Sequence, residues 1–230
     1  MNKIKISIML IGLLLILVLG CVIYNPIINP EDFVNIIDNQ YLPLTPGTTF
    51  TYLGETAEGT EEIKVYVTHE TKEILGVTCT VVRDTVTVDD ELVEYTYDWF
   101  AQHKDGTIWY FGEDSKEYED GEVVSTEGSW EAGVDGAKPG ILMKGNPQIG
   151  DSYRQEYYRG EAEDMAKVLS LNESVSVPYG SFDNCLQTEE WTPLEPDVLE
   201  YKYYAPSIGL VLEVDVTTGD RVELIDISTE

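Results

Sequence analysis

Few residues of this 230-residue chain have the types and spacing that catalysis requires. It has two histidines, His69 and His103, which excludes a metal site built on three histidines. His69, Glu70 and Glu73 are metal-binding residue types, but on a strand residues 69 and 73 share one face and residue 70 points away. No serine lies in a Gly-x-Ser-x-Gly motif. We therefore expect no catalytic residue and no cofactor, with a hydrolase as the least favoured alternative.

The 43 acidic residues make chance carboxylate pairs unavoidable, so such pairs alone do not indicate glycoside chemistry. No EF-hand loop is present, because residues before Gly106, Gly121 and Gly136 lack the Asp-x-Asp-x-Asp spacing. Two acidic groups remain as weak cation-site candidates: Glu161, Glu163 and Asp164, or Glu117, Glu119 and Asp120.

Aromatic residues are the most distinctive candidates for ligand binding. Tyrosine and tryptophan combine a large apolar ring with a hydrogen-bonding group, which suits a pocket for an apolar or sugar-like ligand. The alternative is ordinary packing in the core. The candidate pocket residues are Tyr95, Tyr97, Trp99, Trp109, Phe111, Tyr157, Tyr201 and Tyr203, and Tyr153 lies in the same strand-like stretch as Tyr157.

The N-terminus has the composition of an export signal. Lys3 and Lys5 precede the apolar run Ile8–Leu19, which is shorter than a membrane-spanning helix, and Gly20 precedes Cys21. This arrangement resembles a lipobox, the processing site of prokaryotic lipoproteins. The resemblance implies removal of residues 1–20 and lipid on Cys21, which would hold the chain at the extracytoplasmic face of a membrane. An uncleaved anchor helix is the alternative.

Two further cysteines, Cys79 and Cys185, lie in strand-like runs. An exported domain meets oxidising surroundings, so a Cys79–Cys185 disulfide is one expectation. Two separate buried thiols are the other.

From Thr48 onward the hydrophobic pattern has a period of two, as half-buried antiparallel strands require. Turn signals such as Asp105-Gly106 and Asp120-Gly121 separate the runs. We expect an all-β fold of about ten to twelve strands, in which one antiparallel curved sheet closes into a barrel or half-barrel. A change of parity around Arg83 and Asp84 predicts a bulge there.

The expected organisation is a leader (1–20), a lipidated linker (21–47) and one β domain (48–230). Glu31–Asp38 has the pattern of two helical turns, and Met165–Leu171 favours a strand. Gly128–Gly150 is the longest irregular stretch, and either a covering crossover or a ligand-binding lid would explain it.

Two late segments carry a resemblance. Val177–Cys185 reads VPYGSFDNC, and Tyr201–Val211 reads YKYYAPSIGLV. Together they resemble the late hairpin of exported half-barrel proteins, which include relatives of the lipoprotein-localisation factors and uncharacterised lipoprotein families. The resemblance implies a curved sheet whose concave face holds an acyl chain or another apolar ligand, although this chain lacks clear covering helices.

The net charge of the chain limits the classes of partner that it can bind. The formal net charge is −29, and without Lys3 and Lys5 there are 12 basic and 43 acidic residues, which gives −31. Nucleic acid carries the same sign and is excluded as a partner. The favoured function is a lipid-anchored surface protein that binds an apolar or amphiphilic ligand without chemistry. The alternative is a structural or adhesive module whose acidic face meets cations or a protein partner.

Overall fold

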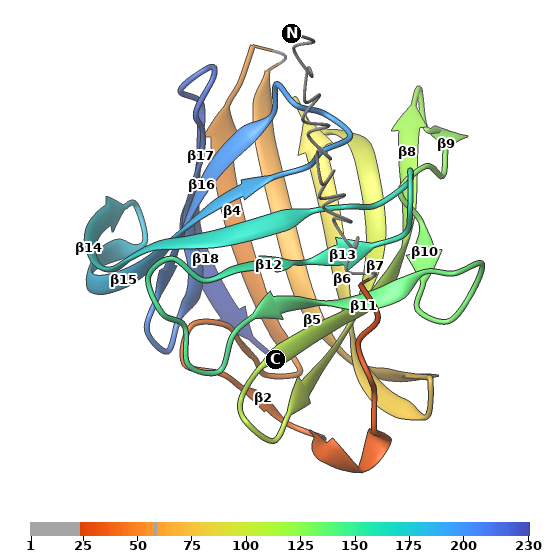
Figure 1. Cartoon of the computed structure of the whole chain (residues 1–230). Coiled ribbons are helices and arrows are strands. Elements are labelled where there is room, and N and C mark those ends of the chain that lie inside the picture. The colour runs from red at the N-terminus through yellow and green to blue at the C-terminus, as the bar shows by residue number, and fades with distance from the viewer. Residues whose placement is uncertain (1–23, 58) are drawn as a thin grey trace, which may run out of the picture.

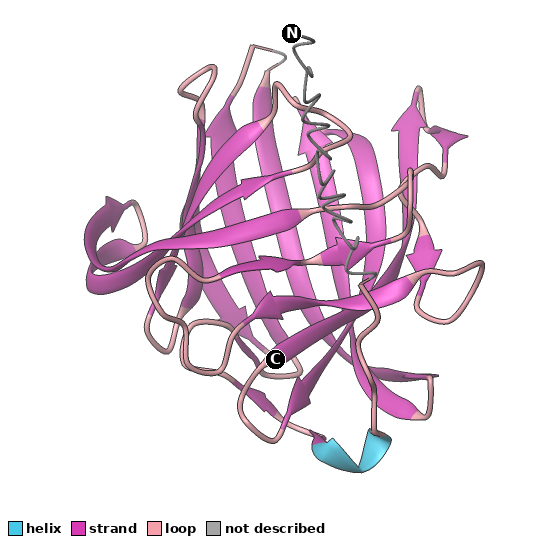
Figure 2. Cartoon of the chain, in the orientation of Figure 1, coloured by secondary structure: helices cyan, strands magenta, loops and turns pink. Residues whose placement is uncertain are grey.

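The structure is a computed structural model that describes residues 24–57 and 59–230, and almost all of its regular elements are strands (Figure 2). The predicted leader and the lipidation candidate Cys21 lie outside these residues. One 3₁₀ helix spans Pro30–Asp32. The strands are β1 (Phe33–Val34), β2 (Ile37–Asp38), β3 (Pro43–Leu44), β4 (Thr48–Glu55), β5 (Thr60–Ile74), β6 (Val77–Val88), β7 (Glu91–His103), β8 (Ile108–Glu119), β9 (Glu122–Ser125), β10 (Trp130–Glu131), β11 (Lys138–Met143), β12 (Ser152–Arg154), β13 (Glu156–Tyr157), β14 (Met165–Val177), β15 (Gly180–Trp191), β16 (Leu199–Ala205), β17 (Gly209–Asp215) and β18 (Arg221–Thr229).

Sixteen of the described strands form one antiparallel sheet that curls into a nearly closed barrel, and β2 and β3 pair separately (Figure 1). Its order is β12-β14-β15-β16-β17-β18-β4-β5-β6-β7-β8-β11-β13, so most neighbours in space are also neighbours along the chain. Alternating runs joined by tight turns favour such a meander. The all-β prediction is confirmed, and eleven strands of six or more residues lie within the described part of the chain.

The two ends of this strand order meet at a seam. β12 pairs with β14 and β13 pairs with β11, and a single residue, Gln155, separates β12 from β13. A Cβ atom on Gly140 of β11 would lie 2.0 Å from the Gln155 carbonyl oxygen. Glycine at position 140 therefore allows the backbones on the two sides of the seam to approach.

One end of the barrel is filled and closed. The inward-facing side chains of this lower half are buried, among them Phe50, Val67, Ile108, Leu186 and Leu224. The chain preceding β4 lies across this end, where β2 is found in Figure 1. There Ile37, Tyr41 and Leu44 join the core.

A buried asparagine holds the closing segment in place. Asn39 donates hydrogen bonds to the carbonyl oxygens of Gly106 and Lys144 and accepts bonds from the amides of Tyr41 and Leu42. Residues 24–47, expected to be a linker, thus belong to the folded unit. The expected helical turns over Glu31–Asp38 are replaced by the short 3₁₀ helix and β1, because Phe33 and Val34 pair with β7.

The irregular stretch Gly128–Gly150 supplies strands to the barrel. β10 and β11 both pair with β8, and β11 reaches the seam through β13. The stretch thus extends the barrel wall. The bulge expected around Arg83 and Asp84 is displaced: the register between β5 and β6 shifts between Val67 and Thr71 of β5.

Candidate functional site

Strand register places carboxylates on the inner face of the upper half of the barrel. Asp98 of β7 stands opposite Glu113 of β8, and Asp84 of β6 stands opposite Thr96 of β7. Paired residues share a face of the sheet. Below them on the same face lie Phe100 and Tyr110, which contribute to the buried core. These acidic residues therefore point into the barrel.

The opposite wall carries a lysine surrounded by glutamates. The ammonium of Lys202 on β16 lies 3.1 Å from Glu213, 3.3 Å from Glu200 and 3.6 Å from Glu190. Thr188 and Tyr204 also donate hydrogen bonds to Glu190. Within the described part of the chain, Lys202 is the basic residue that points into the barrel. The three carboxylates named above already surround its ammonium group.

We call the region between these two walls the acidic chamber. Its lining includes Asp84, Asp98, Glu113, Glu156 and Lys202, which point inward yet each keep part of their surface accessible. Inward residues of the lower half, by contrast, are buried. Because the chamber residues lie inside the wall of strands, their accessible surface faces the barrel interior.

The chamber opens at the end opposite the N-terminal closing segment. A pocket of about 660 Å³ lies at this mouth. Its lining residues are Glu61, Val86, Val88, Asp89, Glu91, Val93, Glu94 and Glu117. Five of these eight residues are acidic, four glutamates and one aspartate. A cation that enters the barrel therefore meets negative charge first.

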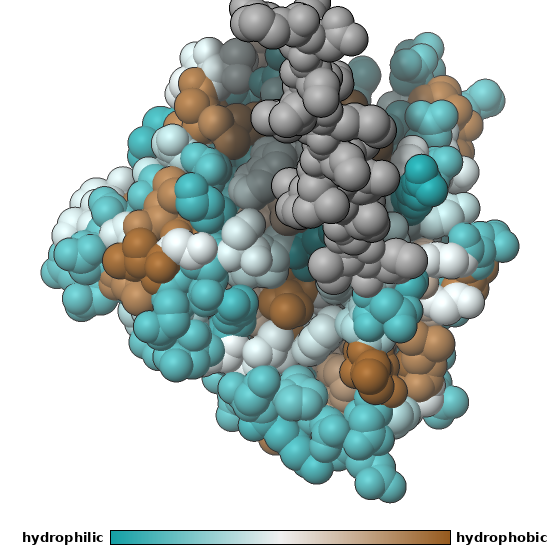
Figure 3. Space-filling model, viewed as in Figure 1, coloured by the Kyte–Doolittle hydropathy of each residue, from teal (hydrophilic) through white to brown (hydrophobic). Residues whose placement is uncertain are grey.

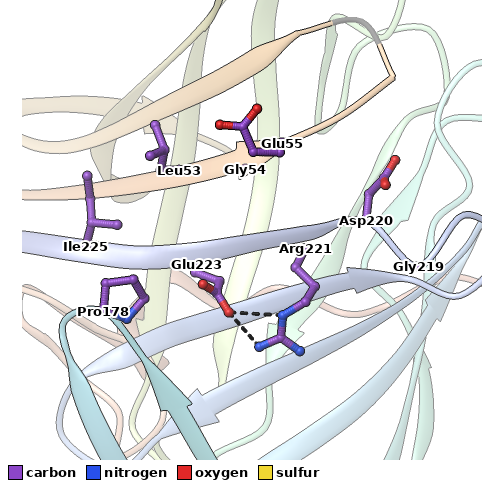
Figure 4. Close-up of a pocket in the computed structure, with 9 residues that line it drawn as sticks. All are labelled: Leu53, Gly54, Glu55, Pro178, Gly219, Asp220, Arg221, Glu223 and Ile225. Carbon is purple, nitrogen blue, oxygen red and sulfur yellow. Dashed lines mark hydrogen bonds and ion pairs between the residues drawn. The ribbon is translucent and has the colours of Figure 1, made fainter.

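A second pocket, of about 370 Å³, lies outside the barrel wall between β4, β18 and Pro178 (Figure 4). Its arginine, Arg221, turns to Glu223 and donates two hydrogen bonds to one carboxylate oxygen. Arg221 and Glu223 of this outer pocket therefore satisfy each other. The outer surface in Figure 3 is largely hydrophilic, with apolar residues in separate patches.

Burial of like charges raises the pKa values of the chamber acids. Burial raises the pKa of Asp98 to about 7, although the Tyr110 hydroxyl donates a hydrogen bond to it. Burial and the charge of Asp98 raise the pKa of Glu113 to about 8. The pKa values of Asp84 and Glu156 are also well above the usual range, chiefly through burial. At neutral pH the chamber therefore holds protons that a bound cation can replace.

Lys202 remains a cation. Burial opposes its charge, but Glu213, Glu200 and Glu190 hold its pKa well above the usual value. Its field also reaches Asp84 and Glu156 and lowers their pKa values slightly against the stronger effect of burial. The two walls thus act on one another electrostatically.

Three buried polar atoms in the described barrel lining lack a hydrogen-bond partner within the protein: Asp84 Oδ1, Tyr153 Oη and Trp130 Nε1. Tyr153 is 7% exposed, and its position opposite Ala166 puts it on the face that carries Glu190. Trp130 is 4% exposed, stands opposite Glu113, and lies with its ring 5.3 Å from that of Tyr110. Buried polar groups are ordinarily satisfied, so each of these atoms is free to form a hydrogen bond with a ligand.

Most of the predicted aromatic candidates lie on the outer face. Tyr95, Tyr97 and Trp99 alternate with the inward-facing residues of β7, and Tyr201 and Tyr203 flank Lys202 on β16. They are occupied by local contacts: the Tyr95 and Tyr97 hydroxyls are 2.8 Å apart, and the Lys72 ammonium lies 3.2 Å from the Trp99 ring centre.

The remaining candidates contact the N-terminal segment. The Phe111 ring packs edge-on against Phe33 at 5.6 Å, and Trp109 lines a small surface pocket that also includes Phe33. Tyr157 packs on Tyr24 at the seam, with ring centres 5.3 Å apart. The structure therefore does not bring the eight candidates together as the lining of the chamber.

The expected disulfide is not formed: Cys79 and Cys185 are buried free thiols. They lie on β6 and β15, and five strands separate these two in the sheet order. A disulfide needs Cα atoms within about 7 Å, which strands this far apart around the wall do not provide.

The acidic groups predicted as weak cation sites do not converge. Glu163 accepts a hydrogen bond from Gly160 and lies 3.6 Å from Arg154, whereas Glu161 is exposed. Glu117, Glu119 and Asp120 lie at and beyond the end of β8. Within residues 24–57 and 59–230 no three His, Cys, Asp or Glu side chains form a group that could hold a metal ion.

The inward carboxylates were missed because acidic residues are abundant in the chain. A usable signal is present: Glu94, Thr96 and Asp98 share one parity on β7, and Glu113 and Ser115 share one parity on the next long strand. Polar residues at alternate positions in both strands that flank the Asp105-Gly106 turn indicate that one face of this hairpin is polar. Parity alone does not say which wall faces the interior.

No family model matches the chain, and no curated protein matches it. Among solved structures, a "putative lipoprotein" from Parabacteroides distasonis is similar to this chain. It is 13% identical, the match covers 83% of this chain and 99% of that one, and the TM-score is 0.43. In the described residues no helix is long and apolar enough to cross a membrane. The chain's own residues therefore carry the functional inference.

Proposed function

We propose that this chain is a lipid-anchored binding protein of the extracytoplasmic membrane face, and that it takes an amphiphilic ligand into the acidic chamber without chemistry. The export-type leader and Cys21 support the anchor. The closed lower end and the open upper end give the barrel the form of a cup.

The observation that carries the ligand-binding proposal is the contrast between the two halves of the barrel interior. Side chains in the lower half fill their space, whereas Asp84, Asp98 and Glu113 above them keep accessible surface, and some polar atoms there have no partner. A core built only for stability is packed and satisfied throughout. The upper half departs from both rules.

The chamber offers contacts for both ends of an amphiphilic molecule. Ile63 and Val65 of β5 stand opposite Val86 and Asp84 of β6 and form an apolar strip beside the acids. Polar groups at a few positions on an otherwise apolar wall are typical of small-molecule sites. Of the apolar or amphiphilic ligand expected from the sequence, these contacts favour the amphiphilic one.

Native mass spectrometry of residues 22–230 tests this proposal, because the described residues form one barrel with its own core. We expect an extra mass that leaves on denaturation. Val86→Trp, which fills the mouth, should abolish it, and the outward-facing control Thr85→Trp should keep it. Bound mass that persists in Val86→Trp, or no bound mass and no uptake of added amphiphiles, would overturn the proposal.

A further inference from the structure

Among the described residues, the chamber holds more carboxyl groups than its one inward-facing lysine can pair with. Lys202 is surrounded by Glu190, Glu200 and Glu213 on its own wall. Across the chamber, Asp84, Asp98, Glu113 and Glu156 raise one another's pKa values or are buried beside one another. Buried carboxylates without a counter-ion are rare in proteins, because each carries a large desolvation cost.

Aromatic rings stand directly beside these acids. Tyr110 packs between Phe100 and Trp130, with ring centres 4.7 Å and 5.3 Å away. The Tyr110 hydroxyl donates to Asp98, and Trp130 stands opposite Glu113 in the sheet. Ring faces combined with carboxylates are the surroundings in which proteins hold organic ammonium ions.

Two of the three unpartnered atoms fit the same kind of ligand, whereas Trp130 Nε1 is a donor and does not. Asp84 Oδ1 and Tyr153 Oη are buried acceptors without a donor from the protein. An ammonium group brings donors and a positive charge, whereas a carboxylate or phosphate brings further acceptors and the wrong sign. The absence of a metal-type grouping of acids in the described residues also favours an organic cation over a bare metal ion.

We propose that the chamber binds an organic ammonium ion, held by the carboxylates of Asp98, Glu113 and Glu156 beside the buried rings of Tyr110 and Trp130. This inference rests on the proposed ligand-binding function. The apolar part of the ligand lies along the strip formed by Ile63, Val65 and Val86. The ammonium takes the place of the protons that the buried carboxylates otherwise hold.

Calorimetric titration of residues 22–230 with four probes tests the inference: octylammonium, octanol, octanoate and dihexanoylphosphatidylcholine. The first three share a chain length and differ in charge, and the fourth carries its ammonium on a lipid phosphodiester. We expect octylammonium to bind at least about tenfold more tightly than octanol, and octanoate not to bind. Tighter binding of the phosphatidylcholine than of octylammonium would also support ammonium recognition, with a lipid headgroup as its source.

A matched pair of variants locates the charge recognition. The double variant Glu113→Gln, Glu156→Gln keeps the size of both side chains and should lose about tenfold or more of the octylammonium affinity while keeping octanol binding. Glu189→Gln removes one carboxylate from the outer face of β15 and should bind like the parent. Melting temperatures of both variants show that the barrel is folded.

Two outcomes separate the two proposals. If octanol or octanoate binds as tightly as octylammonium, or if the double variant keeps full octylammonium affinity, the ammonium inference is wrong and the ligand-binding chamber stands. If none of the four probes binds and the native protein carries no mass, both proposals fail together.

Discussion

Asp98 and Glu113 face each other across β7 and β8, and burial raises their pKa values to about 7 and 8. The folded protein therefore binds protons at a pH where the unfolded chain has released them. The contribution of these two carboxyl groups to the free energy of unfolding is complete below their unfolded pKa, near about 4. It is lost as the pH rises through their pKa values in the folded protein.

We thus expect the melting temperature to fall on the order of 5 °C between pH 6 and pH 8.5. Surface carboxylates contribute little in this window, because they are already ionised. Glu113→Gln should flatten the profile and raise stability at pH 8 by about 1–2 kcal/mol. Thermal melts at half-unit pH steps measure both effects, and an unchanged profile in the variant would contradict the assignment.

Asn39 is the residue on which closure of the lower end depends. It is 5% exposed and makes hydrogen bonds with four backbone groups of three segments. Asn39→Ala leaves these groups without partners and should cost about 2–4 kcal/mol. Denaturant unfolding measures the loss. Asn35→Ala, on the exposed side of the same segment, should stay within about 0.5 kcal/mol of the parent.

Among the elements, the seam is where the barrel wall has least room. Gly140→Ala would push a methyl group against the Gln155 carbonyl, 2.0 Å away, and neither backbone can yield without breaking strand pairs. We expect a loss of at least about 3 kcal/mol in the free energy of unfolding.

Gly180→Ala is the matched control for the seam. Its Cβ would meet only the tip of the Phe182 ring at 3.3 Å, so the cost should be below about 1 kcal/mol. Equal effects of the two substitutions in denaturant unfolding would show that crowding at the seam is not the cause.

The strands were largely predictable from the sequence, but the side of each strand that points into the barrel was not. Alternation and turn residues give the strands and the barrel class because backbone geometry fixes a period of two. Alternation on β7 separates Tyr95, Tyr97 and Trp99 from Glu94 and Asp98, but it does not say which set points inward. Apolar residues usually do, but here the acidic set points inward and keeps part of its surface accessible, whereas the outer rings are covered by local contacts.

Long-range pairing was also beyond the sequence. Gly128–Gly150 carries few alternating residues, since β10 and β11 are short, and only the register with β8 shows that the stretch builds wall. The closing role of Asn39 depends on two loops far along the chain, at Gly106 and Lys144. No local sequence pattern predicts such long-range contacts.

For the whole molecule, a net charge of −29 adds self-repulsion to the folded state. Raising NaCl from about 20 mM to about 500 mM shortens the screening length several-fold and should raise the melting temperature by a few degrees. KCl should act equally. A larger shift with millimolar calcium at matched ionic strength would instead favour a surface that binds cations specifically.

The anchor is tested on the full chain expressed with its own leader in a bacterial host. Intact-mass analysis of the membrane fraction should show loss of residues 1–20 and an added lipid mass. Cys21→Ser should leave no lipid-modified species. Recovery of the complete unmodified chain from the membrane would favour the uncleaved anchor helix.

The pairing of β4 with β18 joins Thr48–Glu55 to Arg221–Thr229, strands from opposite ends of the domain. Hairpins of the meander can assemble as soon as both of their strands are available, but this pair needs a chain that is almost complete. The barrel wall therefore stays open until the last strand has emerged. If the leader directs export, the chain would cross the membrane before its barrel closes and would complete its fold on the far side. Because Cys79 and Cys185 are free thiols in the folded barrel, this last step does not depend on joining them in a disulfide.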